Sequence, residues 1–541
     1  MTKDLLIRGA RIVDGSGAPW FLGDVRVSGD RIAAVGAQLP DEGADVLEAA
    51  GRYLAPGFID AHTHDDLMFL REPERLEKAI QGVTTIVVGN CSFSLYPKAP
   101  AQSDALRRHF GALLGETSEA EIFADFAGYK MALETNGIAL NLVSLVGHGA
   151  LRIAVMGYDE RAPTPAELAE MQRLLARDLA AGAAGLSLGL VYPPSAFART
   201  GELAALAETV AAHQAVLTAH VRSYEAELIP AVDEFLALLK SSGAQGLLSH
   251  LQSAGKPNWG GVGRAIKRLE AARLEGVDVS FDMYPYPAGS STILQLLPPT
   301  AQSGGIDALI GRLQDPVARA GLRQAVEEGD GRNGTWPSKV KLIGWNNVRI
   351  SGVGQPDLKR FEGKAMDAAA AEAGLAPFDF LADLVTRDGG QTTIVMFQLG
   401  EDDLRAAFTH PLHMVGSDSL PRPGTRPHPR AYGTFPRVLG KLARDEGWLG
   451  LEDAVRRMTS IAAQRFGLMD RGLVRPGLAA DLVLFTPDLA DLASFDSPTE
   501  LASGIDRVWV AGETILADGK PTGRRPGRVL GRHGGRSPGR H

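Results

Sequence analysis

Residues 57–66 read GFIDAHTHDD, an apolar stretch that ends in two histidines and two aspartates. Seven further short apolar runs follow along the chain, and segments with helical spacing lie between them. One such segment, EAELIPAVDEFLALLKSSG at 225–243, places its apolar residues three and four positions apart. Eight buried strands that alternate with helices predict a (β/α)₈ TIM barrel. The runs are GFIDAH, TTIVVG, ALNLVSLVGH, GLSLGL, VLTAHV, GLLSHL, VSFDMYPY and HMVGSDS.

The two ends of the chain have a different pattern, in which strand-like alternation is broken by glycine turns. Because chain ends often lie close together, we expect both ends to build one small β-sandwich domain. The spacing between the seventh and eighth strands is too long for a single helix and predicts an inserted subdomain over the active face. The expected order is β-sandwich 1–56, barrel 57–287, inserted subdomain 288–409, barrel 410–472, β-sandwich 473–522 and a basic, disordered tail 523–541.

Composition excludes several classes of protein. The chain has 541 residues, 45% of them apolar and 22% charged, which are values typical of globular proteins. A net charge of -8 indicates no general affinity for nucleic acid or for an anionic membrane. The sequence shows neither a long apolar span nor a leader-like start, and a single cysteine excludes an internal disulfide. We therefore expect a cytoplasmic protein that is a monomer or a small homo-oligomer.

Side chains that can bind a metal fall at the ends of the predicted strands. In a barrel of this kind the carboxyl ends of the strands carry the chemistry. Cysteine sulfur and histidine nitrogen are the ligands that zinc favours. The sequence therefore predicts a zinc site at one pole of the barrel. The residues are His62, His64, Cys91, His220, His250 and Asp418.

Each of these residues has a simpler explanation when it is taken alone. A lone buried histidine is usually satisfied by hydrogen bonds, a lone cysteine is usually a small core residue, and Asp418 could lie in a turn. Those explanations would all have to hold at the same pole, so the joint pattern favours metal binding. Tyr192 either lines the pocket or packs in the core, and His148 is expected to hold loop geometry.

Several motifs together resemble the N-acyl-D-amino-acid deacylases, or D-aminoacylases, of the amidohydrolase superfamily. The motifs are GFIDAHTHDD, VVGNCSFSLYP, GLVYPPSAFA, AHVRSY, SHLQSAGKPNWG, FDMYPYPAGS and VGSDS…RPHPRAYGTFPRVL. The resemblance covers almost the whole chain. Two features depart from the family pattern: the insertion after strand seven is long, and Ser419 stands where the family usually has glycine.

The resemblance implies how the metal is bound. Members of the superfamily usually join two metals with a carboxylated lysine on strand four, but GLSLGL contains no lysine. The resemblance implies that Cys91 takes over, with one tight zinc on Cys91, His220 and His250. It implies a second, weaker site on His62, His64 and Asp418. Three protein ligands leave a position open for water, which is the arrangement of catalytic rather than structural zinc.

The activity implied is zinc-dependent hydrolysis of N-acyl-D-amino acids, small molecules that are cleaved to a carboxylate and a free D-amino acid. Asp418 is expected to take a proton from the attacking water and deliver it to the leaving nitrogen. Lys256, Tyr284 and Arg430 match positions that face substrate in the family, and Tyr192 is a further pocket residue. For Arg430 an ion pair that orders a loop is an equal alternative. The preferred side chain stays open, since Arg430 or Arg426 could supply a cation for an acidic one.

Two other functions compete with this interpretation. The chain could be another amidohydrolase, either a dipeptidase that acts on a D-residue or a cyclic-amide hydrolase, although the absent lysine argues against the ordinary cyclic-amide hydrolases. It could also be a catalytically inactive scaffold protein on the same fold. A scaffold is expected to lose its ligands, and this sequence keeps all six.

Overall fold

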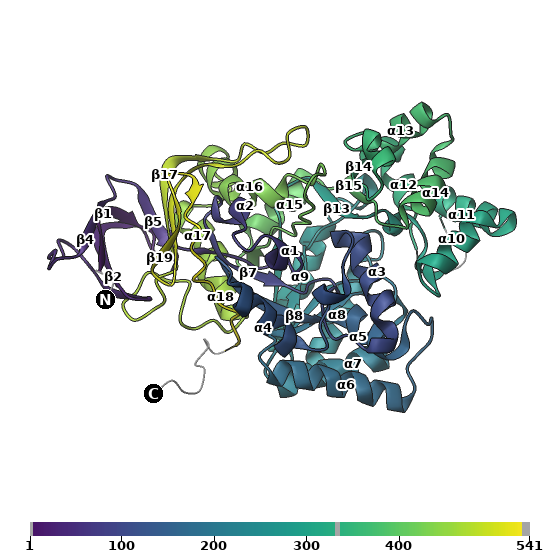
Figure 1. Cartoon of the computed structure of the whole chain (residues 1–541), viewed down its shortest axis with the longest axis horizontal. Helices are drawn as coiled ribbons and strands as arrows, with labels where there is room; N and C mark the ends of the chain where they lie inside the picture. The colour runs from purple at the N-terminus through teal and green to yellow at the C-terminus, as the bar shows by residue number, and fades with distance from the viewer. Residues whose placement is uncertain (1–3, 330–335, 533–541) are drawn as a thin grey trace.

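A barrel of eight parallel strands forms the centre of the molecule (Figure 1). The computed structural model describes residues 4–329 and 336–532. Its strands pair in chain order, and the backbone N–H of Ala61 donates to Val415 O at 3.2 Å where the first strand meets the last. The predicted barrel is confirmed, with strands β6 (Phe58–Asp60), β7 (Val83–Val88), β8 (Asn141–Gly147), β9 (Gly185–Gly189), β10 (Val216–His220), β11 (Gln245–Leu248), β12 (Val279–Met283) and β16 (His413–Val415).

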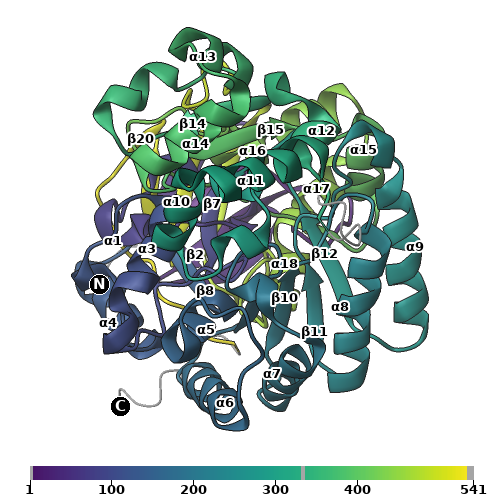
Figure 2. The same ribbon diagram turned by 90° about the vertical axis from the view of Figure 1, so that its right-hand side faces the viewer.

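Amphipathic helices cover the outside of the barrel (Figure 2). In α8 (Leu228–Ser242) the apolar residues buried against the barrel are those at the predicted helical spacing. This helix stops where Gly243 adopts a φ of 74°, a left-handed conformation that glycine takes without strain. The neighbouring helices around this side are α6 (Pro165–Ala180), α7 (Thr200–Ala212) and α9 (Gly261–Leu274).

The two ends of the chain build one β-domain beside the barrel, as predicted. Its nine strands are joined by hydrogen bonds into one sheet. The halves meet where β5 from the N-terminal part pairs antiparallel with β17 from the C-terminal part. The strands are β1 (Leu5–Ile12), β2 (Phe21–Ser28), β3 (Arg31–Gly36), β4 (Asp45–Glu48), β5 (Tyr53–Pro56), β17 (Leu482–Ala490), β18 (Ser503–Val510), β19 (Glu513–Ala517) and β20 (Lys520–Pro521).

The long segment after β12 forms a subdomain with its own hydrophobic core (Figure 1). It combines a three-stranded antiparallel sheet with helices. The next helix, α15 (Glu401–Thr409), packs against α9 and adds Ala407 and Phe408 to the core of the barrel, so we place α15 with the barrel. The elements of the subdomain are β13 (Ala288–Thr292), β14 (Val348–Gly352), β15 (Thr393–Phe397), α10 (Ile306–Gln314), α11 (Pro316–Glu328), α12 (Lys339–Ile343), α13 (Met366–Ala373) and α14 (Pro377–Asp388).

The first part of the predicted tail is ordered, which corrects the expectation of disorder from residue 523. Leu142 N donates to Arg528 O at 3.0 Å, and Leu530 N donates to Leu142 O at 2.7 Å. Val529 and Leu530 are buried against the barrel. The basic composition of the tail led to the prediction of disorder, but the burial of these two apolar side chains favours an ordered segment. Residues 533–541 of the predicted tail lie outside the described residues. Among the helices of the described ranges, none combines the length and apolar character needed to cross a bilayer.

Candidate active site and metal centre

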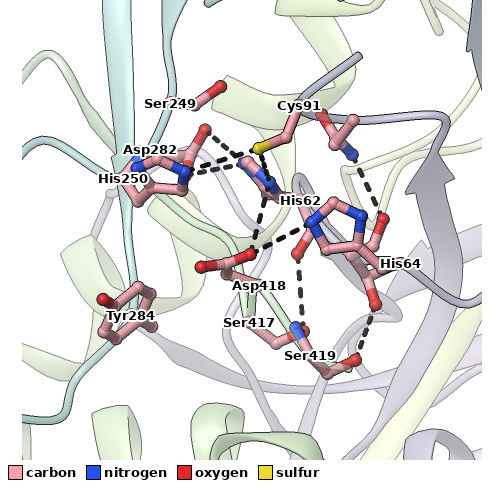
Figure 3. Close-up of polar contacts among 12 residues, drawn as sticks. His62, His64, Cys91, Ser249, His250, Asp282, Tyr284, Ser417, Asp418 and Ser419 are labelled. Carbon is pink, nitrogen blue, oxygen red and sulfur yellow. Dashed lines mark hydrogen bonds and ion pairs between the residues drawn. The ribbon is translucent and has the colours of Figure 1, made fainter. Parts of the chain in front are cut away.

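Three side chains from three strand ends form a compact buried group (Figure 3). Cys91 Sγ lies 3.4 Å from His62 Nε2 and 3.5 Å from His250 Nε2. Cys91 follows β7, His62 follows β6 and His250 follows β11. Because parallel strands end at the same pole of a barrel, positions far apart in the sequence meet here.

A second group shares His62 with the first. His64 Nε2 lies 3.3 Å and His62 Nε2 lies 3.5 Å from Asp418 Oδ1. The ligand atoms of His62, His64 and Asp418 lie within 4.8 Å of one another, as do those of the first group. The structure thus places His62 between the two groups, whereas the resemblance put His220 with Cys91 and His250.

His220 lies beside these groups. It ends β10, and its ring centroid is 4.5 Å from that of His250. Its Nδ1 is buried, and none of the residues that the structure describes forms a hydrogen bond with it. All six predicted ligands therefore occupy the same pole, and His220 borders the Cys91 group through His250.

The backbone at this pole is held in an unfavourable conformation. Cys91, His250 and Asp418 have φ values of 51°, 35° and 48°, in the left-handed region that only glycine enters freely. Each such residue costs about 1–3 kcal/mol and persists only where its surroundings fix it. Three strained residues within one cluster are typical of a functional site.

The protonation of the cluster suits a metal. Burial lowers the pKa of His250 to about 4 and raises the pKa of the Cys91 thiol to about 11. His250 is therefore neutral at pH 7 and offers a lone pair, and a nearby cation would favour ionisation of the thiol. A buried set of one sulfur and several imidazole nitrogens fits zinc.

Asp418 remains ionised in spite of its burial. Burial acts to raise the pKa of Asp418, but the charge of Arg430 and the hydrogen bond to His64 outweigh it and hold the pKa well below the usual range. Arg430 Nη1 lies 2.9 Å from Asp418 Oδ2. This carboxylate is available as a proton acceptor beside both groups of candidate ligands.

Two of the predicted substrate residues lie together at Asp418. Arg430 is fully buried, and its guanidinium carbon stands 4.4 Å from the ring centroid of Tyr284. The Tyr284 hydroxyl donates to Gln252 Oε1 at 3.1 Å. The Nε of Arg430 has no hydrogen-bond partner among the described residues. Arg430 thus forms the ion pair that the sequence analysis considered, and its partner in that pair is the candidate catalytic carboxylate of Asp418.

The other two predicted substrate residues differ in position. Tyr192 is buried, with its ring centroid 5.0 Å from that of His220 and its hydroxyl 3.1 Å from Ser291 Oγ of the inserted subdomain. Lys256 is exposed in the short helix Lys256–Asn258, and no side-chain hydrogen bond or ion pair among the described residues joins it to the cluster. His148 lies in a separate buried network with Glu202, in agreement with the expected role in loop geometry.

Comparison with known proteins assigns the family. Residues 45–282 and 344–516 match the amidohydrolase family. The chain is 38% identical to the N-acyl-D-glutamate deacylase of Alcaligenes xylosoxydans xylosoxydans over 530 residues, which cover 98% of this chain and 96% of that protein. It is 37% identical to the D-aminoacylase of the same organism over 531 residues, which cover 98% of each chain.

This chain belongs to the D-aminoacylase branch of the amidohydrolase family.

The family membership that the sequence motifs predicted is confirmed, and the chain is therefore a hydrolase. Its fold also matches the crystal structure of an N-acyl-D-glutamate deacylase from Bordetella bronchiseptica in complex with zinc and a phosphonate inhibitor. That match has a TM-score of 0.83 and 35% sequence identity, and it covers 98% of this chain and 100% of the other.

Asp282 is a residue of the amidohydrolase site that the sequence analysis missed. Its Oδ1 accepts a hydrogen bond from His250 N at 2.9 Å, and its carboxylate lies 3.3 Å from His62 Nδ1. Nδ1 of His62 faces Asp282, and this turns Nε2 towards Cys91. Burial acts to lower the pKa of His62, but the interactions with Asp282 and Cys91 outweigh it and raise the pKa well above the usual value, so a metal at this position would displace the proton on Nε2. An aspartate inside the buried strand VSFDM was the available signal, because a buried carboxylate needs a partner.

Lys78 lies beneath the site and was also missed. Its Nζ is fully buried and donates to Asp60 Oδ2 at 2.8 Å, Ser417 Oγ at 2.9 Å and Ser419 Oγ at 2.8 Å. The two serines flank Asp418, and Asp60 precedes the HxH motif. Lys78 therefore ties the first strand of the barrel to the last strand at the catalytic pole.

Ser419 contributes to this network at the position where the family usually has glycine. Its Oγ donates to Asp65 Oδ2 at 2.9 Å and stands 2.6 Å from Thr63 Oγ1. The departure from the family pattern thus adds a hydroxyl to a buried network that supports the strained backbone of Asp418.

Proposed function

We propose that this amidohydrolase hydrolyses the amide bond of N-acyl-D-amino acids with zinc, releasing a carboxylate and a free D-amino acid. The observation that carries the proposal is the position of Asp418. Its carboxylate is shared between His64, a candidate metal ligand, and Arg430, a cation able to bind a substrate carboxylate. The names of the relatives, and the zinc and phosphonate in the Bordetella structure, support the proposal.

Cys91, His250 and His220 would hold the tight zinc, with His62 as the residue that borders both sites. His62, His64 and Asp418 would hold a second, weaker metal. When bound, zinc supplies a Lewis acid that polarises the scissile carbonyl and lowers the pKa of the attacking water.

Asp418 is the proposed proton carrier. Its low pKa keeps it ionised at neutral pH, so it can accept the proton of the attacking water. An amine leaves readily only when it is protonated, and Asp418 can return the same proton to the leaving nitrogen. One carboxylate therefore serves both halves of the reaction.

Arg430 and Tyr284 are the proposed binding site for the α-carboxylate of the substrate. A guanidinium has five N–H donors, so Arg430 can hold Asp418 and still offer donors such as its unpartnered Nε. The Tyr284 ring fixes the plane of the guanidinium from one side. Tyr192 lines the site near His220, and Lys256 could join only if its exposed side chain turned towards the site.

A panel of substrates tests the proposal against its alternatives. The purified, zinc-loaded chain is assayed with matched N-acetyl-D- and N-acetyl-L-amino acids, with hydantoins, and with dipeptides that carry a C-terminal D-residue. Preferential hydrolysis of the N-acetyl-D series is expected. Faster turnover of dipeptides or hydantoins would favour the other amidohydrolase activities, and a chain that neither binds zinc nor turns over any substrate would favour a scaffold. The cytoplasmic location and the monomer or small homo-oligomer stay predictions.

A further inference from the structure

A cavity of about 290 Å³ lies next to the candidate metal centre. It is enclosed by α3 (Ser103–Leu114), by the loop after β9 and by the start of the inserted subdomain. Phe93 and Tyr192 line it and also contact the candidate ligands. The Phe93 ring centroid is 6.3 Å from that of His64, and the Tyr192 centroid is 5.0 Å from that of His220. These two rings therefore adjoin both the cavity and the candidate ligands.

The wall of the cavity is mainly uncharged. Its apolar and aromatic side chains include Phe93, Ala105, Ala112, Val191, Tyr192 and Leu294. His109 also lines it, stacked on Phe93 with 4.3 Å between ring centroids and with Nδ1 2.9 Å from the Tyr158 hydroxyl. Burial lowers the pKa of His109 to about 3, so this side chain stays neutral at pH 7. The wall therefore suits an apolar or aromatic group.

Charged side chains occur only at the exposed edge of this cavity. Among the residues that the structure describes, the charged ones that line the cavity are Asp104, Arg108 and Asp307. Arg108 pairs with Asp307 at 2.5 Å, and their side chains are 53% and 77% exposed. Asp104 pairs with Arg107 at 3.0 Å, so each of the three charged lining residues already has a partner. An acidic substituent would meet a mainly apolar interior in which no lining cation is free, and it would lose hydration without gaining a partner.

The two arginines considered from the sequence do not supply the missing cation. Arg430 is bound to Asp418, and Arg426 donates to Asp496 O at 2.6 Å. Neither residue lines the cavity.

We propose that this cavity binds an uncharged, apolar or aromatic substituent of the substrate and selects against acidic D-residues such as D-glutamate and D-aspartate. The inference rests on the proposed function and adds the substrate class. The substituent is the side chain of the D-amino acid, because the cavity can select against acidic D-residues only if that side chain enters it. Burial of one large apolar side chain corresponds to a factor of about 10 to 100 in kcat/KM.

The test compares two series of substrates with the zinc-loaded full-length chain. In the first series the acyl group is acetyl and the side chain is that of D-leucine, D-phenylalanine, D-glutamate or D-aspartate. In the second, D-alanine carries acyl chains of increasing length. We expect kcat/KM for D-leucine or D-phenylalanine to exceed that for the acidic D-residues by about 10-fold or more. The acyl series should show no comparable rise, and a rise in that series alone would overturn the assignment of the cavity to the side chain.

Two variants tie the preference to the cavity. Leu294→Arg adds a cation to the cavity wall and should move the ratio of apolar to acidic substrates towards the acidic ones by about 10-fold. Val317→Arg adds the same charge to α11 of the same subdomain at an 83% exposed position outside the cavity, and it should leave the ratio unchanged. Ala112→Phe narrows the cavity without a charge and should reduce kcat/KM for the bulky substrates more than for N-acetyl-D-alanine.

The results separate the two proposals. A wild-type preference for acidic D-residues, or equal substrate ratios in the wild type, Leu294→Arg and Ala112→Phe, would overturn the assignment of the cavity and leave the deacylase activity standing. Absence of hydrolysis of every N-acyl-D-amino acid would overturn both.

Discussion

The buried network beneath the metal centre and the cavity beside it border the same histidines, but they are built differently. Lys78 brings a charge into the interior and is held by three short hydrogen bonds to residues around the HxH motif and Asp418. The cavity wall is made of rings and aliphatic side chains, and its charged residues stay exposed. Removal of one side chain from the network leaves buried charges without a partner, whereas removal of one from the cavity wall mainly alters the shape of the cavity. The position of the candidate catalytic groups thus depends on a closed polar network, and the proposed selection of substrate depends on an apolar surface.

The largest effect is expected at Asp418, which both regions approach. Asp418→Asn should lower kcat by about 10²- to 10⁴-fold, because the amide can neither accept nor deliver the proton. Zinc content should remain, since the tight site is proposed on other residues. Steady-state kinetics and metal analysis of the same preparation check both statements. Asp233→Asn, which breaks an exposed pair with Arg268 on the outside of the barrel, is the matched control and should keep its turnover. Full activity of Asp418→Asn would exclude Asp418 as the proton carrier.

Lys78→Met should cause the next largest loss, measured as the free energy of unfolding in urea. The variant leaves Asp60 buried without its cation, whereas Asp65 keeps its ion pair with Arg75, and a broken buried ion pair costs about 3–5 kcal/mol. The matched control is Lys130→Met, which breaks an exposed pair with Glu134 at 3.8 Å and should cost at most about 0.5 kcal/mol. Equal losses in the two variants would show that the buried network does not stabilise the barrel.

Asp282→Asn should weaken zinc binding by about 10- to 100-fold, because a neutral amide orients the His62 ring at Nδ1 less strongly than a carboxylate does. Competition with a chelator measures the affinity. Asp388→Asn removes a buried carboxylate from the inserted subdomain, where it accepts from Gly354 N, and serves as the control. Unchanged zinc affinity in Asp282→Asn would mean that this carboxylate does not orient the ligand.

At neutral pH the smallest expected effect concerns His109 in the cavity wall, because this effect develops only as the pH falls. Because burial lowers its pKa to about 3 in the folded protein, the unfolded chain binds the extra proton first as the pH falls below about 6.5. His109 should therefore contribute full stability above that pH and lose about 1.4 kcal/mol per pH unit between about 6.5 and 3. His109→Phe should show a smaller loss of stability between pH 7 and pH 5 in urea unfolding. The exposed His213→Gln should behave like the wild type, and an identical acid loss in His109→Phe would contradict the buried neutral state.

Much of the fold and part of the site follow from local patterns. Eight apolar runs with helices between them predict the barrel, and the ends of parallel strands predict where His62, Cys91 and Asp418 meet, because one rule of topology places them all. Lys78 could not be recognised in this way. It lies in RLEKAI, which has the composition of an exposed helix, and only the packed structure shows that its ammonium group is buried.

The sequence by itself determined the architecture and the family, and it predicted a set of candidate metal-binding side chains, since these depend on periodicity along the chain, on its motifs and on the kinds of residues at strand ends. The tertiary structure decided which side chains share an environment. It placed His62 between the two groups of ligands, paired Arg430 with Asp418, left Lys256 exposed and ordered the segment around Val529 and Leu530. The physical reason is that hydrogen bonds, ion pairs and cavities act over a few ångströms in space, and distance along the chain does not fix those separations.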